Sequence, residues 1–324
     1  MNKLVNKDLF VSIAGELMSM AEAHQRWGEG AFPTPIVGNC FSFQSYSRLP
    51  LATSPGWISE GILPLRSKML VFGLPKSGKS YLASQLSYSV AEGVDWLGFA
   101  AETPVDEPIT LYVQSEIAEI ELQKRLSSLS STGAYAETIH NSKLLGRNVN
   151  ILEERLAVLH PNVLVLDPLY MYIDGDLNKI SDVTKCNDVI DQLIEQYGCS
   201  VVVVHHCRKP SFDGTQGLIE ALGSIAITAF YDSILWLERK SEKFSTLHFT
   251  LRNAISPEPV VLEQQDNGLW KRFDPELPVI SVWTPPGKLS KDLGIPSAKL
   301  QMFLEHLLSS GKVEKNSFGQ FRTA

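Results

Sequence analysis

The residues best suited to chemistry run from 73 to 80 and read Gly-Leu-Pro-Lys-Ser-Gly-Lys-Ser. They match G-x-x-x-x-G-K-[ST], a loop whose backbone N–H groups surround the phosphates of a nucleotide. Its two glycines let the backbone curl inward, Lys79 supplies a charge between the β- and γ-phosphates, and Ser80 supplies a hydroxyl for Mg²⁺. We therefore predict that ATP and Mg²⁺ bind here. The predicted nucleotide-binding residues are Gly73, Leu74, Pro75, Lys76, Ser77, Gly78, Lys79, Ser80 and Tyr81.

The sequence around this loop has the elements needed to hold it. An apolar, strand-like run covers 68–72 and a helix-like run covers 81–91, which favours a true phosphate loop over a chance match. Short β-rich runs then alternate with helical ones, which is typical of a parallel sheet covered on both faces. The predicted strands are 109–114, 162–167 and 200–206, with helices reaching about residue 130 and over 182–197. Three further runs, at 232–238, 246–252 and 259–263, are predicted antiparallel strands that extend the sheet.

Polar side chains end three of the predicted parallel strands, at the edge where ligands bind in open α/β sheets. Asp167 closes an apolar strand and fits a carboxylate that holds Mg²⁺, although an Asp before a proline is also a plain turn former. Glu116 can deprotonate an attacking water, or serve only as an acidic residue at a helix N-terminus. His206 can sense the γ-phosphate, or be an ordinary buried histidine.

Length, composition and charge place limits on the class of protein. The chain has 324 residues, is 44% hydrophobic and 20% charged, and so has the composition of a globular protein. No long apolar run or signal-peptide pattern is present, which predicts a cytoplasmic protein without a membrane span. The four cysteines lie far apart, which argues against zinc and disulfides. A net charge of −7 gives no global sign of nucleic-acid binding, so any such surface must be local.

Together these segments resemble a known family. The runs that end in Glu116, in Asp167-Pro168 and in His206, placed in this order after the phosphate loop, are similar to the RecA-like ATPases of the RepA type. These are the hexameric helicases of broad-host-range plasmids and their phage relatives, and the resemblance covers roughly residues 55–265. It implies a RecA-like P-loop core, with a mostly parallel sheet between helices.

The resemblance also implies roles for single residues. Lys79 belongs to the catalytic set, Glu116 is the catalytic base, Asp167 and Ser80 hold the metal, and His206 senses the γ-phosphate. Arg252 is the best candidate for a finger that reaches into a neighbouring subunit's site. Related helicases often have Lys-x-Arg at the finger, whereas this chain has Thr250 at the first position.

The loop after His206 occupies the place where this superfamily presents DNA-contacting residues to the central channel. Arg208 and Lys209 are the predicted DNA-binding residues, because cations can hold phosphates, and Phe212 can support a base. A solvated loop with two incidental cations explains the same residues equally well.

Three parts of the chain are predicted. Residues 1–55 form an N-terminal helix, over 8–27, and an irregular connector; the helix packs either on a neighbouring subunit or on its own core. Residues 56–280 form the ATPase domain. Residues 285–324 read as helix, turn, helix and hairpin, and so resemble a small winged helix. Residues 288–324 contain six Lys and Arg but only three Asp and Glu. This positive balance permits duplex DNA binding without excluding a replication protein as the partner.

The sequence thus predicts a ring-forming homo-oligomer, a hexamer by resemblance, that hydrolyses MgATP and moves on single-stranded DNA in replication. Two alternatives stay open. One is a recombinase-like or helicase-loading ATPase that binds DNA without unwinding it. The other is an ATP-gated regulator that reads duplex DNA through its C-terminal part.

Overall fold

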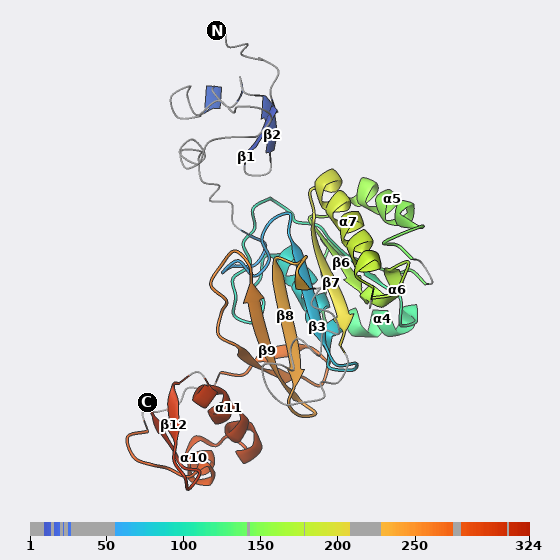
Figure 1. The fold of residues 1–324 in the computed structure, drawn as a ribbon. Coiled ribbons are helices and arrows are strands. Elements are labelled where there is room, and N and C mark those ends of the chain that lie inside the picture. The colour runs from blue at the N-terminus through green and yellow to red at the C-terminus, as the bar shows by residue number, and fades with distance from the viewer. Residues whose placement is uncertain are drawn as a thin grey trace. The chain divides into compact units, whose positions relative to one another are not determined.

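The computed structural model describes two units of the chain, Met1–Gly56 and Trp57–Ala324. The described residues are 10–13, 16–19, 22, 25, 26, 56–140, 143–177, 179–207, 228–274, 280–309 and 311–324. The second unit contains the predicted site and is built on one large sheet (Figure 1). No helix among the described residues combines the length and the apolar character that crossing a membrane requires.

A nine-stranded sheet forms the centre of the second unit, in the order β11-β10-β9-β8-β3-β7-β6-β4-β5. The six strands from β8 to β5 run parallel, and β9, β10 and β11 continue the sheet antiparallel. Strand β7 lies inside the sheet, between β3 and β6, and its four consecutive valines are buried. Such a continuous apolar run suits a parallel strand that helices cover on both faces. The strands are β3 (Lys68–Gly73), β4 (Thr110–Gln114), β5 (Ala134–Thr138), β6 (Val163–Asp167), β7 (Ser200–His206), β8 (Ser233–Arg239), β9 (Phe244–Leu251), β10 (Val260–Gln264) and β11 (Trp270–Arg272).

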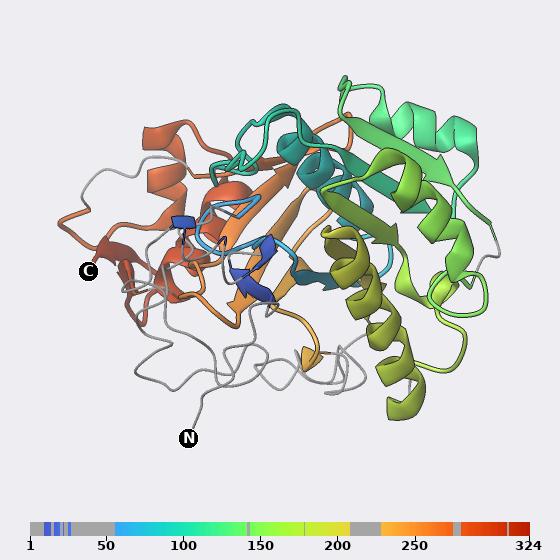
Figure 2. The same cartoon turned by 90° about the horizontal axis from the view of Figure 1, so that it is seen from above.

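Helices cover both faces of this sheet (Figure 2). Helices α3 (Lys79–Glu92) and α4 (Glu119–Leu126) pack apolar side chains into one core layer, together with Trp57 and Trp96. On the other face, α5 (Val149–Leu159), α6 (Leu169–Tyr172) and α7 (Ile180–Tyr197) build the second layer. The sheet between two helical layers confirms the predicted α/β class.

The strands predicted from sequence are all present, with one error of direction, and four elements of the second unit were not predicted. The prediction of antiparallel pairing for 232–238 is wrong on one side: β8 pairs parallel with β3 and antiparallel only with β9. The four elements that were not predicted are strand β5, helix α5, the short helix α6 and strand β11. Strand β5 is an edge strand with only partly buried or exposed residues, so it lacks the apolar run of an inner strand.

The predicted N-terminal helix over 8–27 is also wrong for its central residues. Strands β1 (Phe10–Ile13) and β2 (Glu16–Ser19) pair antiparallel, with Phe10 opposite Ser19. Helical spacing of apolar residues suggested a helix, but Val11 and Ile13 are β-branched and Gly15 disfavours a helix interior. The connector predicted for 28–55 lies outside the described residues.

The C-terminal segment follows the predicted element order. Helices α10 (Pro286–Leu293) and α11 (Ser297–Ser309) precede an antiparallel pair, β12 (Val313–Lys315) and β13 (Phe321–Thr323). This segment has its own small core around Leu300 and Phe321. Phe303 of α11 packs in addition against Phe244 of β9 and Val261 of β10.

Candidate nucleotide-binding and catalytic site

The phosphate loop joins the carboxyl end of β3 to the first turn of α3. Gly73 and Gly78 are required by geometry. A Cβ at Gly73 would lie 2.5 Å from the backbone oxygen of Leu237 in β8. Gly78 has φ +91°, and a Cβ there would lie 2.5 Å from the ring of Trp270. The N-terminal turn of α3 therefore opens directly into the loop, where backbone N–H groups and the helix dipole favour an anion.

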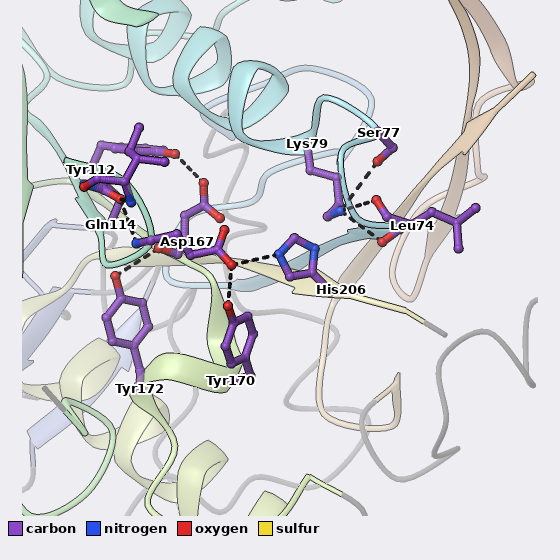
Figure 3. Close-up of polar contacts among 12 residues, drawn as sticks. Leu74, Ser77, Lys79, Tyr112, Gln114, Asp167, Tyr170, Tyr172 and His206 are labelled. Atoms are coloured by element: carbon purple, nitrogen blue, oxygen red, sulfur yellow. Dashed lines mark hydrogen bonds and ion pairs between the residues drawn. The ribbon is translucent and has the colours of Figure 1, made fainter. Parts of the chain in front are cut away.

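Lys79 is almost fully buried and lies folded onto its own loop. Its Nζ donates hydrogen bonds to the carbonyl oxygens of Gly73 (2.9 Å) and Leu74 (2.7 Å), and Figure 3 shows it pointing at the loop. Burial lowers the pKa of Lys79 to about 8, although Asp167, Cys207 and Glu116 raise it in part. The amine is thus a desolvated charge held by weak acceptors, which a phosphate can replace with stronger ones.

Asp167 ends β6 and is buried, with only 2% of its surface exposed. One carboxylate oxygen, Oδ2, accepts a hydrogen bond from the hydroxyl of Tyr112 in β4. The other, Oδ1, is buried and has no hydrogen-bond partner. An orphaned, buried carboxylate oxygen is costly unless it holds a cation or a water bound to one, so this residue fits a Mg²⁺ site.

Ser80, in the first turn of α3, is the second predicted metal ligand. Within the described residues no three His, Cys, Asp or Glu side chains gather into a metal site of their own. A cation at Asp167 would therefore complete its shell with the Ser80 hydroxyl, waters and nucleotide phosphates, as Mg²⁺ usually does.

Glu116 follows β4, the strand beside β6, so Glu116 and Asp167 project from neighbouring strand ends. The Gln114 side chain accepts hydrogen bonds from the backbone N–H groups of Glu116 and Ile117, both at 2.9 Å, and so fixes the turn. The Glu116 Oε1 atom accepts a hydrogen bond from the Tyr170 hydroxyl and lies 3.3 Å from the Nε2 atom of His206. The structure thus brings the predicted base and the predicted sensor into direct contact.

The two histidines at the end of β7 have different surroundings. His205 is 7% exposed, and burial lowers its pKa to about 4, assisted by His206 and Lys79. It is therefore neutral at pH 7 and has no charge to offer a ligand. The side chain of His206 is 22% exposed and reaches Glu116, and its Nδ1 atom is buried without a hydrogen-bond partner.

Arg252 lies apart from these residues. It follows β9, whose last residue Leu251 pairs with Ser233, the first residue of β8. The phosphate loop instead begins beside Leu237, which follows Ser233 by four residues along β8. At 3.3 Å per residue, Leu237 lies about 13 Å from Ser233. Arg252 contacts Asp232 (3.8 Å) and the carbonyl of Ala229. Arg252 is at the amino edge of the parallel strands, out of reach of its own chain's site.

The predicted DNA-binding residues Arg208 and Lys209, and Phe212 close to them in the sequence, lie outside the described residues.

Several residues of the site were not predicted from sequence. Tyr112 and Tyr170 hold the two carboxylates, and the indole of Trp270 in β11 donates a hydrogen bond to the carbonyl of Gly78 (3.0 Å). Arg239, at the end of β8, donates to the carbonyl of Lys76 in the phosphate loop (3.0 Å). Only Arg239 carried a signal in the sequence, as a cation directly after a predicted strand. The other three contacts join residues 54 to 192 positions apart.

Comparison with known proteins agrees with this fold. A family model described as an AAA domain matches residues 49–211, just over half of the chain. A search of curated proteins found no match. Among solved structures, one whose title describes an ATPase domain matches with a TM-score of 0.52 at 11% identity, covering 71% of this chain and 96% of that one. At that identity the likeness shows the fold alone. The RadB recombinase matches with a TM-score of 0.46 at 13% identity, covering 65% and 92%, and supports no further argument.

Proposed function

We propose that this chain, which belongs to the AAA domain family and has a RecA-like P-loop fold, is a ring-forming DNA helicase driven by MgATP hydrolysis. The observation that carries this proposal is the gathering of Lys79, Asp167, Glu116 and His206 at one edge of the sheet, with Arg252 at the other. The first four residues provide what hydrolysis needs. The position of the fifth fits a role in a second copy of the chain.

Binding comes first in this mechanism. The loop backbone and the N-terminus of α3 hold the phosphates, and Lys79 exchanges the carbonyls of Gly73 and Leu74 for phosphate oxygens. Asp167 and Ser80 are the residues that would hold Mg²⁺, which neutralises charge on the β- and γ-phosphates when bound. The hydroxyl of Tyr112 keeps the Asp167 carboxylate in one orientation, leaving Oδ1 for the cation or its water.

Hydrolysis then requires a base and a trigger. Glu116 accepts the proton of the attacking water, and the water oxygen displaces ADP from the γ-phosphorus. His206 reports whether the γ-phosphate is present: it is the last residue of β7, and the chain continues directly from it into residues 207–217, the predicted DNA-contacting loop. Arg252 of one subunit would stabilise the transferring phosphoryl group in the site of the next, as arginine fingers do.

Magnesium-dependent unwinding of a forked duplex tests the helicase proposal most simply. Wild-type protein should separate the strands when ATP is present, and should assemble into a larger particle with a non-hydrolysable analogue. Lys79→Ala should do neither. A protein that hydrolyses ATP in response to single-stranded DNA but never separates strands is instead a recombinase-like or loading ATPase. Tight duplex binding unaffected by ATP would identify a regulator.

The trans role of Arg252 is tested by mixing two defective subunits. Arg252→Ala keeps its own phosphate loop and Lys79→Ala keeps its finger, so a mixed assembly contains some complete sites. Partial recovery of hydrolysis on mixing is expected. No recovery at any ratio would mean that Arg252 acts only through its contacts with Asp232 and Ala229.

A further inference from the structure

Tyr170 is placed to act on the proposed base. It belongs to α6, which begins two residues after Asp167, and its hydroxyl donates a hydrogen bond to Oε1 of Glu116. Its ring lies 5.7 Å from that of His206, and burial together with the Glu116 contact raises its pKa to about 12. The phenol therefore keeps its proton at neutral pH and remains a donor.

The same carboxylate oxygen has a second neighbour. The Nε2 atom of His206 lies 3.3 Å from Glu116 Oε1, so Tyr170 and His206 hold one atom between them. A nitrogen of an imidazole ring carries at most one hydrogen. When His206 donates that hydrogen to a γ-phosphate, it can no longer donate it to Glu116. Of the two side chains that hold Oε1, Tyr170 is the one whose contact can persist.

The second carboxylate oxygen of Glu116, Oε2, is available to accept a proton from the attacking water. In the described part of the chain no hydrogen bond occupies Oε2. The last torsion of a glutamate is broad, so a carboxylate without an anchor samples many orientations. One that is fixed at Oε1 presents Oε2 in a narrower range. Because a misplacement of about 1 Å can cost on the order of 100-fold in rate, such an anchor affects hydrolysis directly.

We propose that Tyr170 is a positioning residue that holds the Glu116 carboxylate for the attacking water once His206 has turned to the nucleotide. The inference rests on the proposed role of Glu116 as base. The ionisable groups that interact with Glu116 include Tyr170 and Tyr172 from α6, His206 from β7 and Lys79 from α3. Of the two tyrosines, only Tyr170 donates its hydroxyl to Glu116, since the Tyr172 hydroxyl donates to the carbonyls of Val113 and Asp167.

The test compares Tyr170→Phe with Tyr135→Phe, which removes the same atom from an exposed tyrosine on β5. ATP hydrolysis is measured in single turnover at neutral pH, and nucleotide affinity by titration with a fluorescent ATP analogue. Tyr170→Phe should lower the hydrolysis rate about 10-fold at unchanged affinity, since the phenol touches the base and not the phosphates. Tyr135→Phe should match wild type in both measurements.

The split between rate and affinity separates positioning from a merely structural effect. A general disturbance of the site would weaken nucleotide binding together with hydrolysis, whereas a misplaced base lowers the rate alone. An unchanged or faster rate, or a loss of affinity equal to the loss of rate, would overturn the inference.

Glu116→Gln, assayed in parallel, distinguishes this failure from failure of the proposed mechanism. If Glu116→Gln is inactive while Tyr170→Phe is normal, Glu116 remains the base and the inference about Tyr170 is wrong. If Glu116→Gln hydrolyses ATP at the wild-type rate, the base assignment fails and the inference about Tyr170 fails with it.

Discussion

The two edges of the parallel sheet differ in how completely their buried polar groups are hydrogen-bonded. At the amino edge these groups are paired: the Ser200 hydroxyl accepts from Trp57 Nε1 (3.2 Å) and from the Ser67 N–H (3.3 Å) and donates to the carbonyl of Pro64 (2.9 Å). Lys68 likewise forms an ion pair with Asp191 at 2.7 Å.

At the carboxyl edge, polar groups are buried without full pairing. Six buried side-chain atoms among the described residues have no hydrogen-bond partner, and three of them belong to Asp167, His205 and His206. Unpaired buried polar atoms are costly, and they concentrate at the edge that would receive a nucleotide. The amino edge is therefore organised for stability, whereas the carboxyl edge retains atoms for a ligand. Substitutions at the two edges should separate activity from stability.

The largest effect is expected at the carboxyl edge. Lys79→Ala should lower ATP hydrolysis on the order of 10³-fold, because it removes the charge that stabilises the transferring phosphoryl group. Its melting temperature should stay near that of the wild type, because removing a desolvated charge offsets the loss of hydrogen bonds to the carbonyls of Gly73 and Leu74. Steady-state hydrolysis and a thermal melt of the same sample check both parts. A variant that unfolds at much lower temperature would show that this edge also carries stability.

At the amino edge we expect a smaller effect, on stability and not on activity. Ser200→Ala should lower the free energy of unfolding by about 3 kcal/mol, because the Trp57 and Ser67 donors lose their partner, whereas the Pro64 carbonyl keeps the Ser67 hydroxyl. The melting temperature should fall by roughly 6–12 °C, while hydrolysis per folded molecule stays unchanged. Ser127→Ala, at the exposed end of α4, is the control and should change the melting temperature little. Loss of activity without loss of stability in Ser200→Ala would contradict the comparison.

The smallest effect concerns protons at the carboxyl edge. His205 has a folded-state pKa of about 4, below the usual value of 6.5, so the unfolded chain binds a proton that the folded one does not. Its contribution to stability is complete above about pH 6.5 and falls as pH drops toward 4, by about 2 kcal/mol between pH 7 and pH 5. Denaturant titrations of wild type and His205→Gln should show this loss only in the wild type. Equal slopes in both proteins would mean that His205 is not the group responsible.

Much of this arrangement could be predicted from the sequence because its signals are local. The phosphate loop is one continuous motif, and strands such as β7 are apolar runs that can be recognised without neighbours. The direction of β8 could not be predicted, because it depends on pairing with β3, about 160 residues earlier. Helix α5 was missed because it buries only Leu152 and Leu156.

The candidate site shows the same difference between local and long-range signals. That Asp167, Glu116 and His206 lie near one another could be predicted because each ends a strand, and parallel strands bring their carboxyl ends together. Tyr170 and Tyr112 were missed, since a tyrosine in a mixed sequence carries no sign that its hydroxyl will meet a carboxylate 54 or 55 residues away. The N-terminal helix was predicted from apolar spacing alone, and the β-branched residues of β1 outweighed that spacing.

The central claim is that Glu116 acts on the attacking water and takes no part in holding the nucleotide. Single-turnover hydrolysis and nucleotide affinity of Glu116→Gln, measured on the same preparation, test it most directly. The amide keeps the size of the side chain but cannot accept the proton, so the rate should fall by about 10²- to 10⁴-fold while affinity stays at the wild-type value. Hydrolysis at a rate near that of the wild type, or a loss of affinity equal to the loss of rate, would contradict the assignment.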